Sequence, residues 1–375
     1  MSTLHHTLRQ KRILFLVNSL GGGGAEHVFV KQLNALHTQG YDVSLATLYP
    51  SPEGRSIESL LTIPKDKRLF LGFRSLFDVR ALWRFLRLMR GTHFDLVYST
   101  LHEANAVARF LALARSSRTA FVVREASTAE KKPSHLKRWD RWTMSRVRRV
   151  IAVSEEVETS LLAYMPHAKE KIVILHNGVD VAPPHLPADT AVRSLLTVGR
   201  CTEAKNQGAI LQALYLLQGQ ADLPPHVFHL AGDGALKTSL EAQTQALGLS
   251  RCVRFYGHLA PKQVSELYQA ADIFLLSSLW EGSPNVLLEA MAHGVACVAT
   301  RVGGVPFILR HEETGLLVPP GDVQTLANAI RRLLVDSDLR QRLGQAARAH
   351  IEANFSFSKH LEHLLDVFQT TTQSL

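Results

Sequence analysis

Residues 279–294 read LWEGSPNVLLEAMAHG, a polar turn that opens an apolar helix. The turn follows the apolar run at 272–277 (DIFLLS), which predicts a buried parallel strand. Pro284 suits the first position of a helix, where its missing N–H costs nothing, and Gly294 suits the position after the last turn. Open α/β sheets bind ligands at such loops, and the N–H groups at a helix N-terminus attract phosphate. This stretch therefore predicts an α/β fold with an anion-binding site.

Two acidic residues, Glu281 in the turn and Glu289 in the helix, are separated by seven residues. Glu289 has apolar neighbours on all sides of the helix, among them Leu288 and Ala290. A helix that is apolar all round is buried, and a buried glutamate needs a partner. This pattern predicts that a ligand hydroxyl pair or a cation contacts Glu289. The alternative is a solvated glutamate on the helix surface.

With these flanks, the segment resembles the signature of the retaining glycosyltransferases of family 4, which have the GT-B fold. That fold has two Rossmann-like, doubly wound α/β domains facing each other across a cleft. The resemblance implies that Glu281 is catalytic and faces the donor sugar, and that Glu289 holds the ribose hydroxyls of a nucleotide sugar. It also implies donor contacts from the turn and the start of the helix, at Gly282, Ser283, Pro284, Asn285 and Val286.

Two more loops in the second half of the chain follow predicted strands. Arg200 and Lys205 come after the strand expected at 195–198, and two cations on one loop suit a pyrophosphate. The alternative is a pair of solvated cations, but their spacing resembles the phosphate pair of the family. Gly257 and His258 come after a strand expected at 253–256. The resemblance implies that this turn contacts the donor nucleobase.

The first half opens like a Rossmann unit, with a strand expected at 12–17, a glycine-rich loop at 18–24 and a helix at 25–40. Such a loop lets a phosphate or sugar approach the backbone closely, although it also occurs in ordinary tight turns. The strand expected at 42–49 ends at Tyr49 and is followed by Pro50 and Ser51. A nicotinamide dehydrogenase needs an acidic residue there to bind the ribose, so the sequence argues against that class of enzyme. The resemblance places Gly22 and Gly23 near the donor phosphates.

Two further loops of the first half carry polar residues after predicted strands. The resemblance implies that His102 is catalytic and that Glu103 and Asn105 contact the acceptor. Arg124 follows the strand expected at 121–123 and could bind an anionic acceptor group with its two-pronged guanidinium. The alternative is a salt bridge between Arg124 and Glu125.

Charge is distributed unevenly over the 375 residues. Residues 1–180 hold 27 Lys and Arg against 16 Asp and Glu, or +11, whereas the remainder holds 15 against 17, or −2. Basic residues are interleaved with aromatic ones at 73–90 and 131–149, which predicts amphipathic segments on an anionic membrane surface. The alternative for 73–90 is a packed helix with a solvated cationic face. RNA is an alternative partner for these basic segments. The chain carries no nucleic-acid-binding motif, however, so binding to nucleic acid is not expected.

Composition favours a cytoplasmic protein. Hydrophobic residues make up 46% of the chain, and the N-terminal apolar run at 13–17 is too short for a signal sequence or membrane span. The three cysteines, Cys201, Cys252 and Cys297, lack metal-site spacing and are expected to be buried free thiols.

The expected organisation is an acceptor-binding domain at 1–182, a nucleotide-sugar-binding domain at 183–355 and a C-terminal helix at 356–375 that returns to the first domain. A proline-rich linker at 181–190 joins the two domains. Asp336-Ser337-Asp338 offers an Asp-x-Asp pattern, but before a polar helix it indicates helix capping.

The resemblance implies retaining, metal-independent transfer from a nucleotide sugar, with UDP favoured over GDP and no cofactor. The expected acceptor is a lipid-linked oligosaccharide or lipopolysaccharide, at the cytoplasmic face of the inner membrane. A nucleotide-sugar epimerase and a non-catalytic sugar-nucleotide-binding protein are the alternatives.

Overall fold

The computed structural model describes residues 8–52, 54, 56–76, 78–114, 119–128, 134–181 and 192–373. The chain forms two compact units, one made of Met1–Asn177 with His360–Leu375 and the other of Gly178–Lys359. The boundaries expected from the sequence, after residues 182 and 355, differ from these by a few residues. Nearly all of the expected linker at 181–190 lies outside the described residues.

The first unit is built on a parallel sheet of seven described strands in the order β3-β2-β1-β4-β5-β6-β7. The central strands β1 and β4 are mostly apolar, and every residue in them except Arg12 is buried, as expected for a sheet covered on both faces. The strands are β1 (Arg12–Val17), β2 (Asp42–Thr47), β3 (Arg68–Phe70), β4 (Leu96–Thr100), β5 (Ala120–Glu125), β6 (Arg149–Ala152) and β7 (Ile172–Ile174).

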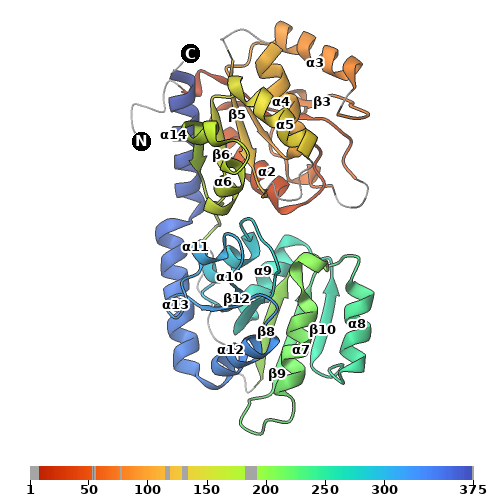
Figure 1. Ribbon diagram of the computed structural model, residues 1–375, viewed down its shortest axis with the longest axis vertical. Helices are drawn as coiled ribbons and strands as arrows, with labels where there is room; N and C mark the ends of the chain where they lie inside the picture. The colour runs from red at the N-terminus through yellow and green to blue at the C-terminus, as the bar shows by residue number, and fades with distance from the viewer. Residues whose placement is uncertain are drawn as a thin grey trace. The chain divides into compact units, whose positions relative to one another are not determined.

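Helices cover both faces of this sheet (Figure 1). One face packs against α3 (Val79–Gly91), α4 (His102–Ala114) and α6 (Glu155–Leu162). The other packs against α2 (Gly24–Thr38) and α14 (Phe357–Gln373), whose Leu364 and Phe368 are fully buried in that core. The C-terminal helix is therefore part of the first unit's core, from His360 onward.

The second unit repeats this plan with a parallel sheet of six described strands in the order β10-β9-β8-β11-β12-β13. The strands are β8 (Arg193–Val198), β9 (His226–Ala231), β10 (Val253–Gly257), β11 (Ile273–Leu276), β12 (Ala296–Thr300) and β13 (Leu316–Val318). The helices are α7 (Gln207–Leu217), α8 (Lys237–Ala246), α9 (Pro261–Ala270), α10 (Asn285–Ala292), α11 (Val305–Ile308), α12 (Val323–Val335) and α13 (Ser337–Asn354).

These two doubly wound sheets confirm the prediction of two Rossmann-like α/β domains. Asp336 caps α13 by accepting a hydrogen bond from the Leu339 N–H at 2.8 Å, so its predicted role as a helix cap is confirmed. Cys201 and Cys297 are buried free thiols as expected, whereas Cys252 is only half-buried. Among the described residues, no helix is both long and apolar enough to cross a membrane.

A buried histidine joins α14 to the rest of the first unit. His360 is 4% exposed, and its Nδ1–H donates to the carbonyl oxygen of His176 at 2.6 Å. Its Nε2 must therefore accept, and it does so from the side-chain amide of Gln32 at 2.7 Å. Burial lowers the pKa of His360 to about 4, against the opposing effect of the His176 carbonyl and with the help of the Arg124 cation.

This neutral histidine makes stability depend on pH. Between pH 6.5 and 4 the unfolded chain binds a proton at His360 that the folded protein does not, so the unfolding free energy falls as the pH is lowered through this range. The loss reaches about 3 kcal/mol at the acid end and is absent above pH 7. Urea unfolding gives the unfolding free energy of the wild type and of His360→Gln at each pH. Between pH 6.5 and 4 this free energy should depend less steeply on pH in the variant. Equal slopes in the two proteins would contradict this assignment.

Candidate functional site

In the second unit, the strand order reverses direction between β8 and β11, and the loops after these two strands meet. The Leu279 N–H donates to the Ala204 carbonyl at 2.8 Å, which ties the loop after β11 to the loop after β8. The loop after β9 also lies close to the loop after β8. A Cβ on Gly232 would lie 1.8 Å from the Gly199 carbonyl oxygen. Only glycine fits at that position.

A charged pair joins the two loops. The Lys205 ammonium donates to Glu281 Oε1 at 2.5 Å, and these side chains are 22% and 11% exposed. The sequence predicts one residue for the diphosphate and the other for the sugar, and the structure brings them into direct contact. Arg200, on the same loop as Lys205, is exposed, and its side chain makes no hydrogen bond or ion pair with the described residues. The site therefore holds two cations and one carboxylate before the glutamate of α10 is counted.

Three buried hydroxyl groups hold this pair, and the sequence analysis did not identify them. Ser277 Oγ lies 2.9 Å from the carbonyl oxygens of both Lys205 and Asn206, within reach of a shared hydrogen bond. Ser278 Oγ donates to Glu281 Oε1 at 2.6 Å, and Thr300 Oγ1 donates to the Ser278 carbonyl at 2.6 Å. Hydroxyl residues at the carboxyl end of a buried strand, next to a predicted site, are the sequence signal for such a role.

Glu289 is half-buried, so the prediction that its helix is buried on all sides is wrong. The side of α10 that carries Asn285, Val286 and Glu289 stays partly open, while the rest packs into the core. Glu289 also has a protein partner that the sequence did not reveal, because the Tyr268 hydroxyl donates to its Oε2 at 3.0 Å. Burial and Glu289 together raise the pKa of Tyr268 well above its ordinary value, so the hydroxyl stays a donor.

The donor residues predicted in the second half of the chain lie at the same edge of the second sheet. The Gly304 N–H donates to the Gly282 carbonyl at 3.1 Å, which joins the loops after β11 and β12. Ser283 and Pro284 lead into α10, where the buried Ser283 hydroxyl has no partner among the described residues. Gly257 ends β10 and accepts from the Gly232 N–H at 2.8 Å, with an exposed His258 following it.

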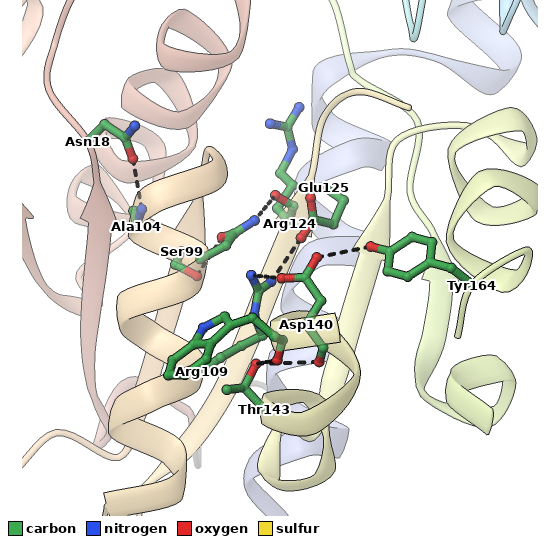
Figure 2. A network of polar contacts seen from close by, with 11 residues as sticks. Asn18, Ser99, Ala104, Arg109, Arg124, Glu125, Asp140, Thr143 and Tyr164 are labelled. Atoms are coloured by element: carbon green, nitrogen blue, oxygen red, sulfur yellow. Dashed lines mark hydrogen bonds and ion pairs between the residues drawn. The ribbon is translucent and has the colours of Figure 1, made fainter. Parts of the chain in front are cut away.

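The first unit has a similar reversal between β1 and β4. Asn18, just after β1, accepts from the Ala104 N–H at 2.8 Å (Figure 2). It also donates to Glu103 Oε2 at 3.2 Å, so it fixes the start of α4. Gly23 precedes α2, and a Cβ there would lie 2.5 Å from a carboxylate oxygen of Glu26. His102 is half-buried and begins α4.

Asn105 is fully buried and both ends of its side-chain amide are occupied. Ser99 donates to its Oδ1 at 2.7 Å, and its Nδ2 donates to the Arg124 carbonyl at 2.9 Å. This geometry favours a role in fixing β5 against α4 over the direct acceptor contact that the sequence suggests.

Arg124 is 1% exposed, and its two terminal nitrogens donate to Thr100 Oγ1 at 3.2 Å and Asn177 Oδ1 at 2.6 Å. Burial lowers the pKa of its guanidinium. The alternative of a salt bridge to Glu125 is wrong, because neighbouring side chains on a strand point to opposite faces of the sheet. Glu125 instead pairs with Arg109 at 3.2 Å.

Arg109 is the centre of a buried ionic network that joins α4, β5 and α5 (Ser134–Thr143) (Figure 2). Its guanidinium contacts Asp140 at 2.6 Å as well as Glu125, and it is 0% exposed. The Tyr164 hydroxyl donates to the second oxygen of Asp140 at 3.1 Å. This network therefore holds α4 and α5 against β5.

Comparison with known families assigns the chain to a class. Residues 22–183 match the family model described as Glycosyltransferase Family 4, and residues 182–350 match the one described as Glycosyl transferases group 1. The two ranges run consecutively over most of the chain. The chain belongs to the family 4 glycosyltransferases, which have the GT-B fold, as predicted.

Curated relatives fall into two groups by coverage. A D-inositol 3-phosphate glycosyltransferase of Corynebacterium diphtheriae is 34% identical over 49% of this chain and 43% of its own length. The lipopolysaccharide core biosynthesis glycosyltransferase LpsE of Rhizobium meliloti is 34% identical over 48% of this chain and 50% of its own. These matches thus span half or less of each relative. An α-1,3-galactosyltransferase of Escherichia coli, which uses UDP-Gal and a GlcNAc-diphosphoundecaprenol, is 22% identical over 92% of this chain and 93% of its own.

Solved structures show the same fold. Anabaena Alr3699/HepE in complex with UDP aligns with a TM-score of 0.79 at 20% identity, covering 96% of this chain and 100% of that one. The lipopolysaccharide outer core galactosyltransferase WaaB aligns with a TM-score of 0.77 at 18% identity, covering 96% and 99%.

Proposed function

We propose that this protein is a retaining glycosyltransferase that transfers a sugar from a UDP-sugar to a cell-envelope glycan, such as a lipid-linked oligosaccharide or lipopolysaccharide. The observation that carries the proposal is the cluster of Arg200, Lys205 and Glu281 where the loops after β8 and β11 meet, beside the N-terminus of α10. Cations and free helix N–H groups suit a diphosphate, and a carboxylate suits the hydroxyls of a sugar.

In this proposal each group has a separate task. Arg200 and Lys205 bind the diphosphate, which becomes the leaving group, and stabilise the charge that develops on it. Glu289 accepts from ribose hydroxyls on the half-open side of α10, with the Tyr268 hydroxyl holding one of its oxygens. Glu281 faces the transferred sugar. The first unit supplies the acceptor side, with His102 and Glu103 at the start of α4.

The relatives support the choice of substrates. The Escherichia coli relative that aligns over nearly its whole length is named for UDP-Gal and a diphosphoundecaprenol-linked sugar, and LpsE is named for lipopolysaccharide core biosynthesis. Incubation of the purified protein with UDP-glucose, UDP-galactose and lipid-linked acceptors should release UDP and extend the acceptor. An epimer formed from the UDP-sugar alone would instead identify an epimerase. Binding without transfer or hydrolysis would identify a non-catalytic sugar-nucleotide-binding protein.

The proposal includes independence from metal ions, because protein cations occupy the place where a divalent ion would neutralise a diphosphate. Transfer should therefore proceed at an unchanged rate in the presence of EDTA. The rate of UDP release with and without the chelator is the measurement. Loss of activity with EDTA and recovery with magnesium or manganese would contradict this assignment.

We also propose that the first unit binds the anionic membrane surface that carries such acceptors. On α3, Ala81, Phe85 and Met89 face the core, while Trp83 is 57% exposed among arginines, and Arg87 lies 5.6 Å from its ring centre. On α5, Trp142 is 62% exposed. Exposed tryptophan beside cations is typical of side chains at the level of lipid headgroups.

The protein should sediment with phosphatidylglycerol vesicles at low salt and be released as salt shortens the Debye length. Replacing Arg80 and Arg87 by Gln should weaken binding about thirtyfold, at about 1 kcal/mol for each cation near the surface. Arg331→Gln, on α12 of the second unit, is the matched control and should bind like the wild type. A wild-type protein that stays in the supernatant at low salt would exclude this surface.

A further inference from the structure

Two neighbouring serines follow β11, and each holds a different part of the candidate site. Ser277 and Ser278 are 2% and 0% exposed. The Ser277 hydroxyl contacts backbone carbonyls of the loop after β8, at Lys205 and Asn206. The Ser278 hydroxyl instead contacts the carboxylate of Glu281 at 2.6 Å. The first serine therefore fixes a loop, and the second fixes a single side chain.

The contacts of Glu281 leave its two oxygens unequal. Oε1 accepts from both the Lys205 ammonium at 2.5 Å and the Ser278 hydroxyl at 2.6 Å. In the described part of the chain, Oε2 accepts no hydrogen bond. A carboxylate has room for further donors, so Oε2 is the atom free to accept from a bound hydroxyl.

We infer that Ser278 is a positioning residue that holds Glu281 Oε1 so that Oε2 accepts from a hydroxyl of the donor sugar. This inference rests on the proposed function. A diphosphate competes with Glu281 for Lys205, because both are anions that suit an ammonium group. Once Lys205 turns to the diphosphate, the Ser278 hydroxyl is the remaining described group on Oε1, and it keeps the carboxylate aimed.

The orientation of Ser278 is itself set by the strand next to it. The Thr300 hydroxyl, at the end of β12, donates to the Ser278 carbonyl at 2.6 Å, and Thr300 is 2% exposed. The backbone of Ser278 is thus fixed before any ligand binds. Glu281 then needs little reorganisation on binding the sugar, which is the condition under which a hydrogen bond contributes most to affinity and rate.

The two serines provide a matched experiment, because Ser278→Ala and Ser277→Ala each remove one buried hydroxyl from adjacent positions. Calorimetry measures the affinity of each variant for UDP and for UDP-glucose or UDP-galactose, whichever the wild type transfers. Ser278→Ala should leave UDP affinity within about twofold, weaken the UDP-sugar about tenfold and slow transfer at saturating donor about tenfold. Ser277→Ala should weaken UDP and the UDP-sugar by equal factors, because it loosens the loop that carries Lys205.

The ratio of the affinities for UDP and for the UDP-sugar distinguishes a positioning role from a merely structural one. A structural role would lower both affinities equally. Ser278→Cys keeps a weaker donor and should give an intermediate ratio. Equal losses for UDP and the UDP-sugar in Ser278→Ala would overturn the inference while the proposed function stands. The inference is also overturned if the wild-type protein binds UDP and the UDP-sugar with equal affinity. Absence of binding and transfer with every UDP-sugar would overturn both.

Discussion

Glu281→Gln is expected to slow sugar transfer at saturating donor about 100-fold while leaving the affinity for free UDP unchanged or slightly higher. The rate falls because the carboxylate charge lies beside the sugar, where positive charge develops in the transition state. Affinity for UDP is spared because the substitution removes the anion that pairs with Lys205 at 2.5 Å in the ligand-free site. A diphosphate then meets a less occupied ammonium. Single-turnover rates and calorimetric UDP affinity are the two measurements.

Glu289→Gln is the matched control for this substitution, since it makes the same change of one carboxylate to an amide. Gln keeps an oxygen that can accept from the Tyr268 hydroxyl, so the local packing is preserved. It loses the charge that strengthens hydrogen bonds to ribose, and UDP and the UDP-sugar should weaken alike. The division of roles fails if Glu281→Gln weakens UDP as much as Glu289→Gln does, or turns over at the wild-type rate.

The sheet of each unit could be predicted because most of its strands contain a short apolar run. The bounds of β1 agree with the predicted strand at 12–17, and β10 extends the predicted strand at 253–256 by one residue. β3 was missed, since its three residues are partly exposed at the sheet edge and carry little apolar signal. Hydrophobic periodicity finds strands with two covered faces better than short edge strands.

The site was harder to predict, because its contacts join residues that are far apart in the chain. Lys205 and Glu281 belong to loops that meet only when β8 and β11 become neighbours in the sheet. Each was singled out from its own surroundings, but no local pattern shows that they pair. The contact between Tyr268 on α9 and Glu289 likewise cannot be predicted from the sequence, because it forms only when α9 packs against α10. Residue types could be read from the sequence, and the pairings required the tertiary structure.

Arg124 and Glu125 show the reverse case, in which adjacency in the sequence misleads. Two opposite charges next to each other suggest a salt bridge, but a strand sends them to opposite faces. Arg124 then meets Asn177, and Glu125 meets Arg109. The predicted strand ends at residue 123, whereas β5 runs through Glu125, so this salt bridge is excluded only once the full length of the strand is known.

The ionic network around Arg109 gives the largest expected effect on stability. Arg109→Met keeps the approximate length of the side chain but removes the cation shared by Glu125 and Asp140 (Figure 2). These two acids would then be buried without a cation, since their side chains are only 11% and 2% exposed. Breaking a buried ion pair from one side costs about 3–5 kcal/mol, and urea unfolding should show a loss of that size in the first unit.

Two further variants test whether this cost comes from burial and geometry. Arg331→Met breaks a pair with Asp222 whose side chains are 44% and 51% exposed, and it should cost less than about 1 kcal/mol. Arg109→Lys keeps the charge but loses the fork that reaches Glu125 with one nitrogen and Asp140 with another, so an intermediate loss is expected. If Arg109→Met costs no more than Arg331→Met, the two buried acids do not depend on this guanidinium, and the network stabilises the fold through packing alone.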